Sequence, residues 1–284
     1  MIADGTPGTG APAHHTPEHS VSPDEIAGHL EVALEIADRC DALTLPAFQD
    51  RSFSVELKSN HTEVTEIDRS CETLIADSLA HMRPDHAMFG EEFGHRTAMA
   101  DDETVWQWIV DPIDGTSGFA RGVPVWATLL ALSHRDAGLV AAVISAPALG
   151  RRWWATLGGG SLVNGARCQV SRIDRLEDAQ VSITHHRGWD ELDKTAALVA
   201  LGQRARRVRG LGDFWQHCLV AEGAIDIAVD AVGLEPYDLA AVRLVVEQAG
   251  GTFTDRHGVA THETATAIST NTELHPLVLA ALSD

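Results

Sequence analysis

Positive charge is scarce in this sequence. Its 284 residues include 21 Lys and Arg against 41 Asp and Glu, so the formal net charge is -20 at pH 7. With so few cations the chain offers no broad basic face to phosphates, which argues against general nucleic-acid binding. An acidic chain can still bind a small phosphorylated metabolite where metal ions reverse the local sign of the charge.

Cysteine is also sparse, and long apolar runs are missing. The four cysteines form no CxxC pair; they are Cys40, Cys71, Cys168 and Cys218. This pattern argues against a zinc cluster and favours free thiols in a reducing cytoplasm. No apolar run approaches the length that spans a bilayer. We therefore expect a cytoplasmic protein that does not associate with a membrane.

The first 21 residues lack both the basic stretch and the apolar core of a signal peptide. They are rich in Gly, Pro, Thr and His, a composition that predicts a disordered tail over 1–21. His14, His15 and His19 could bind metal weakly, although a solvated tail is the simpler interpretation.

The remaining residues, 22–284, suffice for a substantial core. No internal repeat appears, and no linker divides the chain. We therefore expect one α/β (α+β) domain built from two sheet-and-helix halves, about 22–175 and 176–284, that share one interface.

Periodicity places the elements within these halves. Apolar residues have helical spacing over 22–48, with Ser22 as N-cap and Pro23 in the first turn, and again over about 65–82. Between 123 and 171, β-rich runs alternate with glycine turns, which predicts successive antiparallel strands. Beyond 176, strands alternate with helices, which we expect over 191–204, 213–224 and 237–251.

The stretch WIVDPIDGTSGF, residues 108–119, places Asp111 and Asp114 directly after an apolar strand. Asp, Pro and Gly all favour turns, so an ordinary turn could account for each residue of the Asp-Pro and Asp-Gly dipeptides taken by itself. Glu91 and Asp238 also lie at element boundaries, where an aspartate that caps a helix would be ordinary. Together the four acids offer the oxygen ligands that hard cations such as Mg2+ need, and two such ions roughly 3.5–4 Å apart can clamp a phosphoryl group.

The next two residues suit the phosphate itself. Gly115 lets the backbone approach a ligand closely, and Thr116 offers both an N–H and a hydroxyl. If a helical turn begins there, its free N–H groups form an anion site.

Three stretches carry a family resemblance: GEEFG (90–94), WIVDPIDGTSGF and YDLAAVRLVVEQAGG (237–251). Together they resemble the inositol monophosphatase-like family of Mg2+-dependent, lithium-sensitive phosphatases, from about residue 24 to the C-terminus. Within that family, FARGVPVWATLLAL, GDFWQHCLVAEGAIDIA and EPYDLAAV are most similar to histidinol-phosphate phosphatases of the actinobacterial type. The resemblance implies an alternating αβαβα sandwich of the inositol monophosphatase/fructose-bisphosphatase type, a homodimer, and hydrolysis of L-histidinol phosphate to L-histidinol.

The resemblance also implies roles for individual residues. Two or three Mg2+ ions would be held by Glu91, Asp111, the carbonyl of Ile113, Asp114 and Asp238, and Mn2+ would be able to replace Mg2+. Thr116, backed by Asp68, would orient a metal-activated water for direct in-line attack, with Glu91 helping to position it and no phosphoenzyme formed. The N–H groups of Gly115 and Thr116 would hold the phosphate. The substrate would further contact Glu91, Asp114, Asp238, Asp213 and Asp230, the last of which could equally be a solvated strand-end acid.

Some residues depart from the family pattern and leave alternatives open. Ser117 and Gly118 replace the usual residues after DPIDGT, and Asn60 and Glu63 replace an acid and a proline in KSNHTEVTEID (58–68). The alternatives are an inositol-1-phosphate substrate, another small sugar or nucleoside phosphate, or a catalytically weak binding paralogue. The GRRWWAT stretch could supply interface aromatics, or Trp153 and Trp154 could belong to the core.

Overall fold

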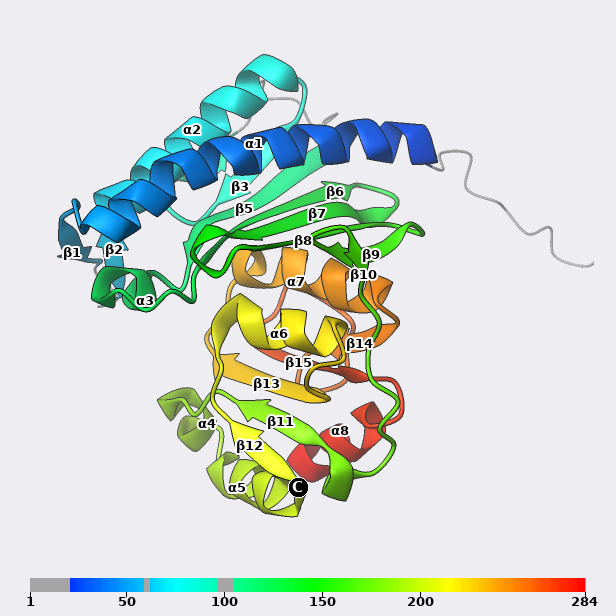
Figure 1. Cartoon of the computed structure of the whole chain (residues 1–284). Coiled ribbons are helices and arrows are strands. Elements are labelled where there is room, and N and C mark those ends of the chain that lie inside the picture. Colours follow the sequence, from blue (N-terminus) through cyan, green and yellow to red (C-terminus); the bar gives the residue numbers. More distant parts are fainter. Residues whose placement is uncertain (1–20, 59–61, 97–104, 284) are drawn as a thin grey trace, which may run out of the picture.

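The computed structural model describes residues 21–58, 62–96 and 105–283 (Figure 1). The histidines of the N-terminal segment and Asn60 lie outside the described residues. Within this part of the chain, none of the helices combines the length and the apolarity that crossing a membrane requires.

The fold consists of alternating helical and sheet layers, as expected from the resemblance (Figure 1). Among the described residues, the larger sheet has eight strands in the order β10 (Ala166–Arg167), β9 (Gly160–Val163), β8 (Arg151–Thr156), β7 (Gly138–Ala146), β6 (Ala127–His134), β5 (Trp106–Asp114), β3 (Ala87–Gly90) and β4 (Gly94–Arg96). The smaller sheet has five, in the order β12 (Arg207–Arg209), β11 (Gln180–Ile183), β13 (Ile227–Val232), β15 (Thr266–Asn271) and β14 (Gly251–Thr254). The neighbouring strands from β6 to β10 are antiparallel, which confirms the prediction for 123–171.

Helices fill the remaining layers. The outer face of the larger sheet is covered by α1 (Pro23–Asp50) and α2 (Glu66–Met82), and the space between the sheets holds α6 (Asp213–Ala221) and α7 (Pro236–Gln248) (Figure 1). The far side of the smaller sheet carries α4 (Arg187–Glu191), α5 (Thr195–Arg204) and α8 (His275–Ser283). A two-stranded hairpin, β1 (Val55–Leu57) and β2 (Glu63–Thr65), joins α1 to α2, and α3 (Thr116–Arg121) follows β5. The described residues also contain two short 3-10 turns, at Pro147–Leu149 and Leu176–Asp178.

The first helices begin where the sequence predicts. The hydroxyl of Ser22 accepts a hydrogen bond from the backbone N–H of Glu25 at 3.2 Å, and Pro23 occupies the first turn of α1. Thr65 caps α2, since its hydroxyl accepts from the N–H groups of Ile67 and Asp68. Both helices therefore start from local capping chemistry.

The second half differs from the sequence prediction in two places. The helix expected over 191–204 starts later than predicted, since α5 spans Thr195–Arg204 and a separate short helix, α4, ends at Glu191. Asp193, between them, adopts a left-handed backbone with a φ of 57°, which breaks the helical run. Helix α8 was not predicted. It packs Val278 and Leu282 against the smaller sheet, and the ring of His275 contacts the hydroxyls of Thr254 and Thr270, each at 2.9 Å.

A buried aromatic cluster lies beneath α1 at one end of the larger sheet. The indole N–H of Trp108 donates to Nδ1 of His86 at 3.0 Å, and the His86 ring stacks on Trp106 with 5.6 Å between ring centroids. His29 lies 5.0 Å from His86, centroid to centroid. Because Nδ1 accepts this hydrogen bond, the His86 ring is neutral in this arrangement.

This cluster predicts acid sensitivity. Burial, reinforced by the neighbouring His29, lowers the pKa of His86 to about 4 from an ordinary value of 6.5. The neutral ring therefore contributes stability above the ordinary pKa that is lost as the pH falls toward the folded-state pKa. Between about pH 7.5 and about pH 5, we expect the free energy of unfolding to fall less in His86→Phe than in wild type. Urea denaturation of both proteins measures this, and equal pH dependence would contradict it.

Candidate active site

Strand β5 carries two acids on one face of the sheet because it contains a bulge. Asp111 pairs with Leu129 and Asp114 with Ala127, so three steps along β5 match two steps along β6. In a regular strand, residues three apart point to opposite faces. The extra residue restores a common face. Pro112 lies inside the bulge, and its carbonyl accepts a hydrogen bond from the Thr128 hydroxyl at 2.9 Å.

Three carboxylates converge at this end of β5. One oxygen each from Asp111, Asp114 and Asp238 can be chosen so that all three lie within 4.8 Å of one another. Backbone N–H groups hold each carboxylate: Ile113 donates to Asp111 at 2.9 Å, Phe214 to Asp114 at 2.7 Å, and Glu235 to Asp238 at 2.7 Å. The larger sheet and the helices α6 and α7 thus position the acids together.

The electrostatics of this cluster favour a cation. Burial first, and then the neighbouring carboxylates, raise the pKa values of Asp111 and Asp114 well above their ordinary range. Burial likewise raises the pKa of Asp238 to about 7. Asp111 is buried, and Asp114 and Asp238 are partly buried. Carboxylates that repel one another in such a setting are stabilised by an ion of opposite charge. Because all donors are oxygens, the residues fit a hard divalent cation.

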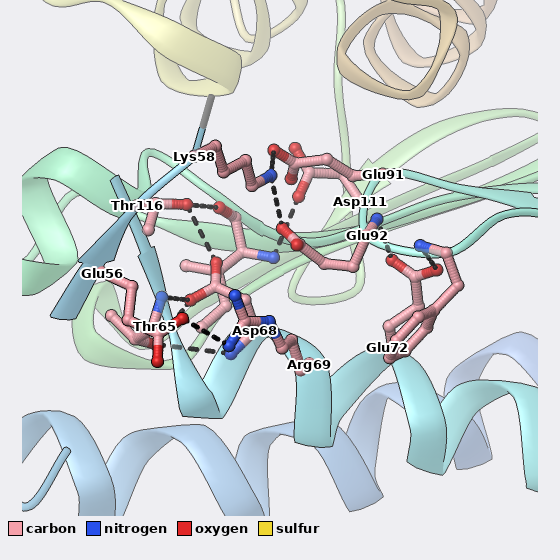
Figure 2. Close-up of polar contacts among 12 residues, drawn as sticks. Glu56, Lys58, Thr65, Asp68, Arg69, Glu72, Glu91, Glu92, Asp111 and Thr116 are labelled. Carbon is pink, nitrogen blue, oxygen red and sulfur yellow. Dashed lines mark hydrogen bonds and ion pairs between the residues drawn. The ribbon is translucent and has the colours of Figure 1, made fainter. Parts of the chain in front are cut away.

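Glu91 lies next to this cluster, at the end of β3 (Figure 2). The backbone N–H of Glu91 donates to the carbonyl of Val110 at 3.3 Å. This hydrogen bond extends the pairing of β3 with β5 as far as the residue before Asp111. Nζ of Lys58 is 2.8 Å from Oε1 of Glu91 and 2.7 Å from Oε1 of Glu92. Burial alone would lower the pKa of Lys58, but the two carboxylates raise it above its ordinary value. No role was predicted for Lys58 or Glu92, although Lys58 begins the stretch KSNHTEVTEID and Glu92 lies in GEEFG.

Thr116 and Asp68, which come from different elements, are in contact (Figure 2). The Thr116 hydroxyl is 2.9 Å from Oδ1 of Asp68 and 2.9 Å from the carbonyl of Ile113. Since a hydroxyl has one proton, it can donate to only one of them at a time. The other carboxylate oxygen of Asp68 accepts from the N–H of Thr65 at 2.8 Å, so the buried acid is oriented by the start of α2.

Gly115 occupies a position that requires glycine. Its φ of 87° is left-handed, and a Cβ there would lie 3.0 Å from the carbonyl oxygen of Val125. The same Cβ would lie 3.4 Å from a carboxylate oxygen of Asp213. Asp213, at the start of α6, therefore borders the Gly115–Thr116 turn that is predicted to hold the phosphate. A helical turn does begin at Thr116, as that assignment assumed.

Asp213 and Asp230 belong to a second acidic group beside the first. Asp213 is exposed as a whole residue, but desolvation of its carboxylate, together with the nearby Asp230 carboxylate, raises its pKa to about 6. Asp230 lies on β13 and is 5% exposed, with Oδ2 2.9 Å from Nε2 of His217. The alternative of a solvated strand-end acid is therefore wrong for Asp230. Nδ1 of His217 is 2.7 Å from the Ser269 hydroxyl. No sequence pattern marked His217, which lies in the predominantly apolar helix α6.

Two of the departures from the family pattern meet in space. Nη2 of Arg121 is 2.7 Å from Oε1 of Glu63, and Nη1 of Arg121 also donates to the side chain of Ser117. Glu63 lies on β2, while Ser117 and Arg121 lie on α3. The Glu63 and Ser117 departures therefore act together to tie the β1–β2 hairpin to the turn after Asp114.

Comparison with known proteins agrees with this geometry. Residues 27–284 match the Inositol monophosphatase family. The Histidinol-phosphatase of Mycobacterium tuberculosis is 43% identical over 259 residues, covering 89% of this chain and 97% of that protein. The Histidinol-phosphatase of Streptomyces coelicolor is 38% identical over 262 residues, with coverage of 89% and 96%. The solved structure of the extragenic suppressor protein suhB from Bartonella henselae has a TM-score of 0.82 at 27% identity, covering 90% of this chain and 99% of that one. The chain belongs to the inositol monophosphatase family.

Proposed function

We propose that this protein is a metal-dependent phosphomonoesterase that hydrolyses L-histidinol phosphate to L-histidinol and phosphate. The observation that carries the chemistry is the convergence of Asp111, Asp114 and Asp238 within 4.8 Å, beside the Gly115 turn. The two bacterial relatives of 43% and 38% identity, both named histidinol-phosphatases, support the substrate.

Five residues supply the proposed metal ligands. Glu91, Asp111 and the carbonyl of Ile113 would hold one Mg2+, and Asp111, Asp114 and Asp238 a second. Two or three ions would bind in all, and Mn2+ could replace Mg2+. When bound, such ions neutralise the phosphate and lower the pKa of water. The Ile113 carbonyl can take part while it contacts Thr116, since a carbonyl oxygen has two lone pairs.

The protein's own groups would then do the positioning. The Thr116 hydroxyl, held by Asp68 at 2.9 Å, would orient the attacking water in line with the leaving oxygen. Backbone N–H groups of Gly115 and Thr116 would hold the phosphate oxygens. Glu91, Asp114 and Asp238 would border the same phosphate.

Asp213 and Asp230 would face the alcohol half of the substrate. L-histidinol phosphate carries an ammonium and an imidazole there, which an acidic pocket attracts, whereas a neutral inositol gains nothing from it. Arg121, which lies on α3 after the Gly115 turn, is paired with Glu63. This pairing occupies the cation that a second phosphate would need, which disfavours a bisphosphate sugar.

The substrate assignment predicts a selective effect of Asp213→Asn. One lost charged hydrogen bond is worth roughly 1.5–3 kcal/mol, so kcat/KM for histidinol phosphate should fall about tenfold or more. Turnover of inositol 1-phosphate should change much less. Asp226→Asn is the control, because Asp226 is an acid that accepts a backbone N–H from Gln180 next to the end of β13 that lies opposite Asp230.

The wild-type substrate panel decides between the remaining alternatives. A preference for inositol 1-phosphate, or turnover of only another sugar or nucleoside phosphate, would refute the histidinol phosphate assignment. No release of phosphate from any small ester with Mg2+ present would favour the binding paralogue, which the complete set of acids argues against.

We further propose a cytoplasmic homodimer. Trp153 is not available for an interface, since it is fully buried and its indole N–H donates to Glu222 at 2.8 Å. Trp154 is partly exposed and could still contribute. Sedimentation analysis tests the dimer.

A further inference from the structure

A buried glutamate on α2 reaches the turn that carries Glu91 and Glu92 (Figure 2). Glu72 is 0% exposed. Its Oε2 accepts the backbone N–H of Glu92 at 2.7 Å, and its Oε1 accepts that of Phe93 at 3.0 Å. Hydrogen bonds from N–H groups to a carboxylate are stronger than those between neutral groups. The side chain therefore holds two consecutive amides of the turn.

Gly90 makes room for this contact. A Cβ at position 90 would lie 2.3 Å from Oε1 and 2.6 Å from Cδ of Glu72. Gly90 belongs to β3, and its φ is not in the left-handed region. Space for the Glu72 carboxylate, and not an unusual backbone conformation, thus explains why a glycine precedes the acidic pair.

The two contacts fix Glu91 from both sides. On the N-terminal side, the Glu91 N–H donates to the carbonyl of Val110, the residue before Asp111. On the C-terminal side, the next two amides are held by Glu72. The position of the Glu91 carboxylate relative to Asp111 and Lys58 therefore depends on this buried side chain.

We propose that Glu72 is a positioning residue which, through the space left by Gly90, fixes the Glu91–Glu92 turn and thereby sets the affinity of the site for its divalent cation. This inference rests on the proposed metal-binding role of Glu91. A glutamate that only stabilised the fold would affect melting but would leave the affinity of the folded protein for Mg2+ unchanged.

The test is a double-mutant cycle read out by calorimetric titration with MgCl2 alone, without substrate. Glu72→Ala and Gly90→Ala should each raise the Kd for Mg2+ about tenfold, the loss expected for charged hydrogen bonds. The double variant should resemble either single variant, because the three atoms nearest to a methyl group at position 90 all belong to the Glu72 carboxylate. At saturating Mg2+, kcat should stay within about threefold of wild type.

Further variants make each outcome decisive. Glu72→Gln keeps the side-chain volume and one acceptor, so its Kd should be intermediate, and it replaces Glu72→Ala if that variant does not fold. Ser78→Ala is the matched control, since Ser78 is a buried polar residue of α2 that contacts Arg39 instead of the turn. A wild-type Kd for Mg2+ in Glu72→Ala or Glu72→Gln would overturn the positioning role. So would a double variant whose increase in Kd equals the product of the two single increases. Wild-type affinity in Glu91→Gln would instead refute the proposed metal site itself.

Discussion

Turnover falls below about a hundredth of the wild-type rate when Asp111 is replaced by asparagine, if the proposed two-metal site is right. Asp111 is the acid that would contact both ions, and an amide cannot supply the negative charge that bridges them. Phosphate release from histidinol phosphate at saturating Mg2+ measures the effect. Residual activity above about one hundredth would refute the assignment.

The same variant should remain folded. The amide oxygen of asparagine can still accept the Ile113 N–H that Asp111 accepts at 2.9 Å. The substitution also removes a buried charge that is repelled by Glu91, Asp114 and Asp238. We therefore expect an unchanged circular dichroism spectrum and a higher melting temperature without metal. Asp255→Asn serves as a control, because Asp255 is buried but caps a distant turn through His257 and Val259.

Removal of divalent metal should abolish activity completely. After dialysis against EDTA, we expect no phosphate release until Mg2+ is restored in the millimolar range, partial recovery with Mn2+, and a lower rate with added Li+. Excess Ca2+ should inhibit, because it takes more ligands in a looser geometry than the octahedral arrangement that Mg2+ requires. Readdition of Mg2+ should also raise the melting temperature, since a ligand of the native state stabilises it.

Two results would contradict the predicted dependence on Mg2+. Full activity after dialysis, or recovery with Zn2+ alone, would show that the acids hold a different ion or none. The all-oxygen donor set argues against zinc, which binds mainly through nitrogen and sulfur.

Local sequence signals were enough to find the acids at the strand end. The Asp-Gly dipeptide marks where β5 stops, although the strand continues through Asp111 and Pro112 to Asp114 instead of ending at Val110 as predicted. The capping residues Ser22 and Thr65 mark where helices begin. These features depend on neighbours in the chain. The resemblance then added Asp68 and Asp213, which the structure places beside Thr116 and Gly115.

Residues whose surroundings come from distant parts of the chain could not be found in this way. Lys58 meets its two carboxylates across 33 and 34 residues, and Glu72 meets its amides across 20 and 21. The sequence alone does not distinguish a buried helical glutamate such as Glu72 from a glutamate on the solvent-exposed face of a helix. The bulge in β5 is equally invisible, since it appears only in the pairing with β6.

The hydrogen bond from Phe214 to Asp114 joins residues 100 positions apart, one at the end of the larger sheet and one on a helix between the sheets. The acids around it have the same divided origin, because Asp238 lies on α7. Complete ligation thus becomes possible only after both parts of the chain have docked. An ion bound there would therefore stabilise the protein only after it has folded. It would lower the rate of unfolding and leave the rate of folding unchanged.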